Sequence, residues 1–434
     1  MENYMRLTVP EIDCSEGFTT ENDIFNRKKF STQLENIIAN SDDENLVIAL
    51  NEKWGNGKTT FLKMWEAEIK KNEKFNVVYF DAFQNDFQSD PFIAIASHIY
   101  AKIDNELLKE KYLSATKKVA SVLLKTSLKI GISALTLGTV KGSEFESLGD
   151  DISSAINDPL EKYIEEKITQ LDKENNTLEH FRSTLSDIAA EKKLIFIIDE
   201  LDRARPNYSL ELLERIKHVF NTKNIYFILS TDKEQFIKVI QKTYGSIDAS
   251  MYLNKFIHLW VSLPKDDNAG MKSFTLSKYV NYINKKILSR NIDLKPSLDV
   301  LSYLLRINNF SLRDAERCYS LLLLCNTSFD NGLKWEYQIG VAIAVFLKLK
   351  DESLLIKIKE RTITKNHVME ALGVTELPEE DNYHILLALN TEYLTREGYA
   401  KALREEDQTI FRSNFGQQPL TISHAIDLIF NVQQ

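Results

Sequence analysis

Five short apolar runs alternate with amphipathic stretches between residues 46 and 264, and this alternation constrains the fold more than any other feature. The runs cover residues 46–51, 75–83, 194–199, 224–232 and 255–264. Continuous apolar runs bounded by turn signals are typical of parallel strands, because helices cover both faces of a parallel sheet. The stretches between them include residues 209–220, whose apolar side chains recur at helical spacing. The sequence therefore predicts an α/β fold built on a parallel sheet.

The remaining segments are predicted to be helical. Residues 104–190 interrupt the α/β pattern with a mostly polar stretch of helical spacing, and no convincing strand follows Pro264. Residues 1–45 are polar and contain one helical pattern. We therefore expect three parts, which are an N-terminal arm and helix (1–45), an α/β core with a helical insertion at about 104–190 (46–264), and a mostly helical C-terminal lid or partner-binding region (265–434).

Composition and charge narrow the class of protein. The 434 residues carry a formal net charge of −9, and 43% of them are hydrophobic, as in ordinary globular proteins. An acidic balance argues against broad nonspecific binding to nucleic acids, which requires a basic surface. The three cysteines, Cys14, Cys318 and Cys325, have no metal-ligand spacing. Their small odd number, and the lack of an apolar signal segment at the start, favour a cytoplasmic location.

The segment NEKWGNGKTT (51–60) lies directly after the first apolar run and before a helical stretch. Its Gly57-Lys58-Thr59 matches the end of the phosphate-loop pattern G-x-x-x-x-G-K-[ST], in which backbone N–H groups surround phosphate oxygens. Lys58 would reach the β- and γ-phosphates of ATP, and Thr59 would bind Mg²⁺. Glu52 replaces the first glycine, and we expect its side chain to point away from the nucleotide. A chance match is the alternative. The predicted ATP-binding residues of this loop are Trp54, Gly55, Asn56, Gly57, Lys58, Thr59 and Thr60.

The third apolar run ends in Asp199-Glu200, within LIFIIDELDRARP (194–206). A strand that ends in two acids suits a Mg²⁺-dependent hydrolase, in which Asp199 would hold the hydration shell of the metal ion and Glu200 would act as the general base. Together with Lys58 and Thr59, these acids make a complete set of groups for ATP hydrolysis. The alternative for the two acids is a solvated turn after a strand.

Other polar residues near strand ends allow two interpretations each. Arg203 or Arg205 could contact phosphate, in the same subunit or across a subunit interface, as an arginine finger. Either could instead form a surface ion pair of small energetic value. Ser230 and Thr231, at the end of the fourth run, are placed where a polar side chain could contact the γ-phosphate, although a simple turn also explains them.

Several segments together resemble the KAP family of P-loop NTPases. They are IIDELDRARPNYSLELLERIKHVF, NIYFILSTDKEQF, YGSIDASMYLNKFIHLWVSLP, the Trp-Gly of KWGNGKTT, and, further out, DIFNRKKFSTQLENI and NFSLRDAERCYSLLL. The resemblance covers roughly residues 23 to 325. It implies an additional-strand, catalytic-glutamate ATPase related to the STAND switches, with ATP and Mg²⁺ as cofactors. Glu200 stands where many relatives have a second aspartate, and this departure favours hydrolysis because a glutamate reaches a water more easily.

The resemblance also implies roles for residues outside the two motifs. Asn26 and Arg27 would lie near the nucleotide base, and Arg313 could act from a helical lid. The sequence from Ser311 to Asp314 has the character of a helix start, which places Arg313 in a first turn. The alternative for Arg313 is an exposed helix residue.

The insertion contains one long, mostly apolar stretch, VASVLLKTSLKIGISALTLGTV (119–140). Members of the resembled family often carry transmembrane helices at this point in the chain. Here Lys125 and Lys129 lie inside the stretch, and charges near the centre of a bilayer are costly. Three interpretations remain, which are a helix that packs on the core or on a partner protein, a basic helix at 117–141 that lies on an anionic membrane, and a membrane span. We favour the first.

We expect a Mg²⁺-dependent ATPase that works as a nucleotide-controlled switch or assembly component, with copies of itself or other protein subunits as partners. Bacterial members of the resembled family include phage-exclusion and antiphage-defence proteins, so a role in antiphage defence is implied by the resemblance alone. The first alternative is a scaffold that binds ATP and turns over little or none of it. The second is a small-molecule or nucleoside kinase, which would share the phosphate loop.

Overall fold

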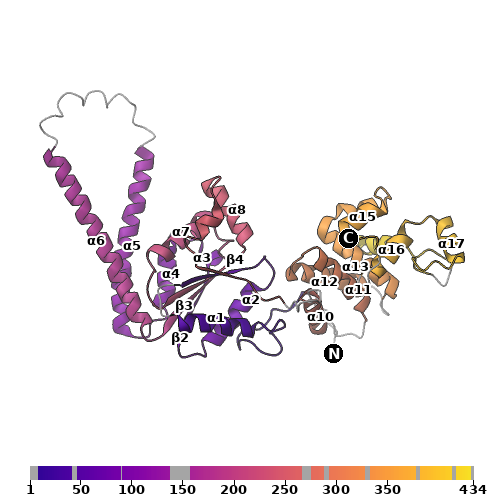
Figure 1. Ribbon diagram of the computed structural model, residues 1–434, viewed down its shortest axis with the longest axis horizontal. Coiled ribbons are helices and arrows are strands. Elements are labelled where there is room, and N and C mark those ends of the chain that lie inside the picture. The colour runs from indigo at the N-terminus through magenta and orange to yellow at the C-terminus, as the bar shows by residue number, and fades with distance from the viewer. Residues whose placement is uncertain are drawn as a thin grey trace, which may run out of the picture.

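The computed structural model describes residues 8–41, 46–88, 90–136, 157–265, 275–287, 293–327, 333–377, 382–412 and 417–431. In this part of the chain, an α/β domain built on one sheet is followed by a group of packed helices. A pair of long helices projects from the α/β domain (Figure 1).

Five parallel strands form the sheet. They are β1 (Leu46–Asn51), β2 (Phe75–Asp81), β3 (Lys193–Asp199), β4 (Ile225–Thr231) and β5 (Leu259–Val261). Their order across the sheet is β2-β3-β4-β1-β5, so β4 lies between the strand that precedes the phosphate loop and the strand that ends in the two acids. In this register Asn51 is level with Thr231, and Asp81 is level with Asp199. The predicted parallel α/β sheet is confirmed.

The fifth strand is shorter than predicted, because three residues of the run 255–264 form it. The backbone N–H groups of Phe256 and Ile257 each bond to Leu253 O at 3.0 Å, at the end of α9 (Ala249–Leu253). These two donors are therefore used by a helix end and not by the sheet. Contact with β1 begins at His258, whose N–H bonds to Val47 O at 3.0 Å.

Each face of the sheet has its own core, since successive strand residues point to opposite faces. Ile48 and Leu50 pack on one face with Phe61 and Trp65. Val47 and the strand residue that alternates with Ile48 and Leu50 pack on the other face. The helices of the first core are α1 (Lys28–Asn40) and α2 (Lys58–Ile69). The helices of the second core include α4 (Pro91–Tyr100), α7 (Pro206–His218) and α8 (Lys233–Tyr244). The short helix α3 (Ala82–Asn85) follows β2.

The insertion forms two long helices, α5 (Glu106–Thr136) and α6 (Asn157–Ala189), which run beside each other and project beyond the sheet (Figure 1). Their ends nearest the sheet pack on the α/β domain, where the ring centroid of Phe181 lies 5.6 Å from that of Tyr112 and 5.5 Å from that of Phe92 in α4. In the stretch expected at 117–141, residues 137–141 and the side chains of 124–136 lie outside the described residues. Among the described helices, none is long and apolar enough to cross a membrane.

The described residues after β5 contain helices and no strand, as predicted. Helix α13 lies at their centre, because its residues from Gln338 to Leu347 are all buried, and the C-terminal helix α18 packs along it. The helices of this region are α10 (Thr275–Ile287), α11 (Lys295–Ile307), α12 (Leu312–Thr327), α13 (Trp335–Asp351), α14 (Ser353–Lys359), α15 (Lys365–Leu372), α16 (Tyr383–Tyr393), α17 (Arg396–Arg404) and α18 (Thr421–Asn431).

Gly340 allows α13 and α18 to approach closely. A Cβ atom at this position would lie 2.3 Å from the carbonyl oxygen of Thr421. We expect Gly340→Ala to lower the free energy of unfolding by about 1–3 kcal/mol, because the backbone of α18 would have to move. Urea unfolding of the two proteins measures this. Gly398→Ala is the control. We expect a smaller change there, because the atom nearest to its new Cβ would be Thr395 Oγ1, at 3.1 Å. An unchanged unfolding midpoint for Gly340→Ala would contradict the close contact.

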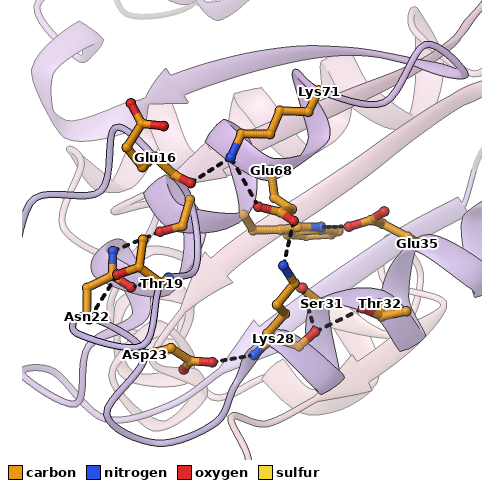
Figure 2. A network of polar contacts seen from close by, with 12 residues as sticks. Glu16, Thr19, Asn22, Asp23, Lys28, Ser31, Thr32, Glu35, Glu68 and Lys71 are labelled. Carbon is orange, nitrogen blue, oxygen red and sulfur yellow. Dashed lines mark hydrogen bonds and ion pairs between the residues drawn. The ribbon is translucent and has the colours of Figure 1, made fainter.

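The arm before α1 is fastened to α2 by a network of polar contacts (Figure 2). Lys28 Nζ lies 2.8 Å from Glu68 Oε1, and Lys71 Nζ lies 3.6 Å from Glu68 Oε2. Lys71 also donates to the backbone oxygen of Glu16 at 2.7 Å. Packing adds to these contacts, because the ring centroids of Phe18 in the arm and Phe61 in α2 are 5.8 Å apart. The arm is therefore held against the helix that begins at the phosphate loop.

Candidate functional site

The chain turns sharply between β1 and α2, over residues 52–57. Gly55 (φ +83°) and Gly57 (φ +80°) adopt left-handed backbone conformations, which glycine adopts without steric cost. Gly57 directly precedes α2, where the unpaired N–H groups of a helix start attract anions. The turn therefore has a backbone suited to binding phosphate.

Glu52, which stands where the phosphate-loop pattern has glycine, supports this turn. Its Oε1 accepts hydrogen bonds from Lys53 N–H at 3.1 Å and from Asn56 Nδ2 at 2.8 Å. The side chain of Glu52 lines a pocket behind the loop and not the cleft in front of it. The carboxylate thus stabilises the turn, and the side of the loop that faces the cleft stays open to a ligand.

The cleft in front of the loop has a volume of about 920 Å³, its open mouth included. One end is apolar and aromatic, with Phe18, Phe61, Met64 and Tyr279, and this surface suits a planar ring. The predicted site residues that line the cleft are Arg27, Trp54, Gly55, Gly57, Lys58, Thr59, Thr60, Glu200, Arg203 and Arg313.

Lys58 and Thr59 begin α2 at the polar end of the cleft. Lys58 is buried, and its Nζ donates to the backbone oxygens of Glu52 and, at 3.4 Å, Lys53. Burial lowers the pKa of Lys58, and nearby carboxylates oppose this effect. Thr59 Oγ1 donates to Glu200 Oε1 at 3.4 Å. The loop and the acidic strand end therefore meet at these two side chains.

Asp199 and Glu200 stand at the end of β3. Asp199 is 1% exposed and accepts hydrogen bonds from Tyr79 Oη at 2.6 Å and from Glu200 N–H at 2.9 Å. Glu200 has a φ of +57°, a conformation that residues other than glycine seldom adopt and that occurs often at functional sites. Its Oε2 lies 2.7 Å from Arg203 Nε. Burial raises the pKa of Glu200, whereas Arg203 lowers it.

Trp54 connects the loop to the same strand end. Its indole Nε1 donates to Asp202 Oδ2 at 2.5 Å, and this oxygen also accepts Asp232 N–H at 3.0 Å. The guanidinium of Arg203 lies 5.4 Å from the centre of the Trp54 ring. Burial raises the pKa of Asp202, whereas the bond from Trp54 and the charge of Lys58 lower it. The carboxylate of Asp202 thus joins three segments at the edge of the sheet.

The arm and the helical region close the cleft from two sides. Arg27 is 7% exposed, and both of its terminal nitrogens approach Asn56 O at 3.4 Å. The start of α12 touches the loop directly, because Arg313 N–H donates to Gly55 O at 3.2 Å and Leu312 N–H donates to Asn56 Oδ1 at 3.3 Å. Arg313 lies in the first turn of α12, as the helix-start pattern predicted.

The remaining predicted site residues do not line the cleft; they are Asn26, Asn56, Asp199, Ser230 and Thr231. Asn26 is exposed, while Asn56 points towards Glu52 and the start of α12. Ser230 and Thr231 are fully buried in β4, and their hydroxyl oxygens have no hydrogen-bond partner in the described part of the chain.

Sequence reasoning missed Tyr79, and it left the role of Asp202 open. Tyr79 lies in β2, two residues before the strand ends level with Asp199. A hydroxyl-bearing residue inside an apolar strand was the available signal, but its partner depends on the strand order. The contact between Trp54 and Asp202 links residues 148 positions apart, and nothing in their spacing indicates it.

A magnesium ion at this site would be bound mainly by water and by the phosphate oxygens of its ligand. The described residues contain no group of three or more His, Cys, Asp or Glu side chains that could hold a metal ion. Mg²⁺ commonly takes only one or two protein side chains, together with water and phosphate oxygens. The residues that would hold such an ion are Thr59, whose hydroxyl donates to the Glu200 side chain, and Asp199, whose carboxylate accepts the Glu200 N–H.

Comparison with known proteins supports the resemblance. Residues 27–367 match the KAP family P-loop domain. The chain is also 22% identical over 242 residues to the phage T7 exclusion protein of Escherichia coli (strain K12). That match covers 52% of this chain and 31% of the relative, so the chain spans less than a third of the length of the relative.

Two solved structures resemble the chain weakly over nearly its whole length. The ORC2 protein of Aeropyrum pernix, solved in ADPNP-ADP complexes, has a TM-score of 0.38 at 13% identity, over 100% of this chain and 96% of that chain. Cdc6p from Pyrobaculum aerophilum has a TM-score of 0.39 at 12% identity, over 98% of this chain and 100% of that chain. Scores this low carry no argument about this protein.

Proposed function

Because this chain belongs to the KAP family of P-loop NTPases, we propose that it binds ATP in the cleft and hydrolyses it, and that its nucleotide state controls an assembly. The approach of Thr59 Oγ1 to Glu200 Oε1 carries the proposal, since it brings the phosphate loop and the acidic strand end together at 3.4 Å. A loop that only binds phosphate does not require an acid at this position.

Each side chain then has a role in the proposed reaction. Lys58 leaves the loop carbonyls and binds the β- and γ-phosphates, and Gly55 and Gly57 let the loop surround them. Glu200 orients the attacking water and accepts its proton. Thr59 and Asp199 would hold the metal ion, and Mg²⁺ would supply positive charge to the phosphate oxygens. The aromatic side chains of the cleft lining would receive the nucleoside, with Arg27 beside them.

Helix α12 is the proposed moving part. Its first two N–H groups bond to Gly55 and Asn56 in the phosphate loop, so any change in the loop on ATP binding reaches the helical region directly. Arg313 lines the cleft from this helix and can contact phosphate. ATP binding would thus reposition the helical region relative to the sheet, and hydrolysis would reverse the change. Copies of the same chain or other protein subunits are the proposed partners.

Phosphate release from ATP tests the proposal. Native protein with Mg²⁺ is expected to release phosphate, and Lys58→Ala is expected to lose both activity and ATP binding. Candidate partner proteins are added in a second series. Arg205 is largely exposed on the surface and could complete the nucleotide site of a neighbouring subunit, so turnover could depend on assembly. Equal phosphate release by native and Lys58→Ala protein would refute the enzyme proposal.

A scaffold that binds ATP without turnover is the second candidate, and the Glu200–Arg203 ion pair favours it. Arg203 Nε lies 2.7 Å from Glu200 Oε2, so the proposed base is already paired with a cation of the same chain. Hydrolysis requires Arg203 to leave Glu200 for phosphate, and a chain that never makes this change only binds. Arg203→Ala separates the candidates: a scaffold keeps ATP bound without turnover, and an ATPase changes its rate.

The pH dependence of turnover reports on Glu200. Burial raises the pKa of this carboxyl above its ordinary value of 4.5. A general base acts when deprotonated, so turnover is expected to fall as the pH drops through a value above 4.5. A pH series of the turnover rate, with circular dichroism at each pH to exclude acid unfolding, measures this. An acid limb at or below 4.5 would contradict the burial of Glu200.

A role in defence against phage is proposed from the relative named as a phage T7 exclusion protein. The match covers under a third of that relative, so the proposal concerns only the shared NTPase region. Plaque counts on bacteria that express the native chain are expected to fall relative to Lys58→Ala. Equal counts for the two chains, at equal protein levels, would argue against a nucleotide-dependent role in exclusion.

A further inference from the structure

A second pocket lies behind the phosphate loop, on the side opposite the cleft. Glu52, Lys53 and Asn56 of the loop form one wall, and Leu276 of α10 and Phe310 lie across from them. Its volume is about 820 Å³, open mouth included. The two hollows share only Arg27 and Leu312 among their lining residues, so the second pocket is separate from the proposed ATP site.

The lining of this pocket is strongly cationic. Among the described lining residues, Arg27, Lys53, Lys265 and Arg306 contribute positive charges and Glu52 contributes a negative charge. Glu52 is already engaged, because Oε1 accepts bonds from the Lys53 backbone and the Asn56 side chain. In the described part of the chain, Lys53 and Lys265 form no ion pair. Four cations around one hollow attract and concentrate an anion.

Buried polar atoms in the same wall lack partners. Arg27 is 7% exposed, yet its Nε has no hydrogen-bond partner among the described residues, and its other nitrogens make only long contacts of 3.4 Å to Asn56 O. Burial lowers the pKa of Arg27 only to about 10, so the guanidinium stays charged at neutral pH. The Thr275 hydroxyl at the start of α10 is also unpartnered within the described chain. A buried charged donor without an acceptor is costly, and a bound anion removes that cost.

We propose that the pocket behind the phosphate loop binds a small phosphorylated ligand, with Arg27, Lys53 and Lys265 contacting its phosphate oxygens. Phosphate suits the pocket better than a single carboxylate, because several cations are present among the described lining residues. A guanidinium also pairs with two phosphate oxygens at once. Leu276, Phe310 and Leu312 give the pocket an apolar side, which can receive the remainder of the ligand.

Occupancy of this pocket would act on the cleft through shared residues. Asn56 bonds to Glu52 at the start of the loop, to Arg27 of the arm and to the N–H of Leu312 in α12. A ligand held between Lys53 and α10 therefore touches the residues that fix the loop to the helical region. If it alters ATP affinity, ATP must alter its affinity by the same factor. The pocket itself does not depend on hydrolysis.

Calorimetric titration with inorganic pyrophosphate tests the site. The protein used is the full chain with Lys58→Ala, which disables the phosphate loop. The native chain is titrated in parallel, because Lys58 bonds to the backbone oxygens of Glu52 and Lys53 in the lining of this pocket. We expect one pyrophosphate to bind per chain. Adding Lys53→Ala and Lys265→Ala is expected to weaken binding at least about tenfold, as removal of two charged contacts does. Both lysines are exposed, so these changes leave the fold intact, which a thermal melt verifies.

The matched control adds Lys238→Ala and Lys242→Ala instead, which removes the same charge from the exposed surface of α8. This pair is expected to leave pyrophosphate affinity within about twofold. Absence of pyrophosphate binding by both the native and the Lys58→Ala chains overturns the proposal, and so does equal weakening by the two lysine pairs. Tighter binding of ADP than of pyrophosphate assigns the pocket to nucleotides, and the reverse assigns it to simpler phosphates. None of these outcomes depends on whether the chain hydrolyses ATP.

Discussion

Replacing Glu200 with glutamine is expected to reduce ATP turnover by about 10²–10⁴-fold while ATP still binds, because a carboxamide cannot accept the proton of the attacking water. The change keeps the size of the side chain and its contact with Thr59 Oγ1. It also frees Arg203, whose ion pair to Glu200 is lost. Steady-state phosphate release and equilibrium binding of ATP, measured on the same preparations, separate the two effects.

Glu211→Gln is the matched control. Glu211 is also partly buried and pairs with an arginine on its own helix, Arg215, but it lies in α7 outside the cleft. It is expected to keep native turnover. Loss of ATP binding by Glu200→Gln would make Glu200 a structural residue, and native turnover by Glu200→Gln would move the base elsewhere.

Asp199→Asn is expected to lower turnover by about 10²-fold or more, since a ligand to the metal hydration shell is worth several kcal/mol in the transition state. Asparagine retains one oxygen, which can accept the hydrogen bond from Tyr79, whereas its amide nitrogen cannot accept the Glu200 N–H; this second bond is lost at a cost of about 1 kcal/mol. The rate is measured across a Mg²⁺ titration, in which the variant should require more Mg²⁺ than the native chain.

Tyr79→Phe distinguishes a metal role from a structural one. It removes the hydroxyl that bonds to Asp199 at 2.6 Å and leaves the carboxylate. We expect a loss of about 1 kcal/mol in the free energy of unfolding and a small change in turnover. If Tyr79→Phe lowers turnover as much as Asp199→Asn, with the same Mg²⁺ dependence, then Asp199 acts by holding the fold and not by holding metal.

Local chemistry made the sheet and the two motifs predictable. Strands such as β3 are continuous apolar runs, so their burial on both faces is visible in the sequence. The two glycines of the loop have positive φ, and a phosphate loop requires that freedom. Ser311 and Asp314 form the reciprocal cap that their spacing indicates, because Asp314 N–H donates to Ser311 Oγ at 3.2 Å and Ser311 N–H donates to Asp314 Oδ2 at 3.0 Å.

Contacts between distant segments were not predictable in the same way. Glu52 was expected only to point aside, whereas its carboxylate bonds to Asn56 and supports the turn. The bond from Trp54 to Asp202 depends on β4 placing Asp232 beside the strand end. Ser230 was placed where a polar side chain could contact the γ-phosphate, with a simple turn as the alternative, and its side chain is buried in β4. These outcomes depend on strand order and on the docking of α12, which no local pattern encodes.

The paired helices of the insertion would amplify small rotations at their base on the α/β domain. Helix α5 has 31 residues, and at 1.5 Å per residue it spans about 46 Å. Its base is clamped by Tyr112, Phe181 and Phe92, while the chain that leaves α6 runs into β3, which ends in Asp199. A rotation of about 10° at that base would carry the far end of α5 by about 8 Å, from the same helix rise. Small movements near the acidic strand end would thus become displacements large enough for a neighbouring molecule to detect.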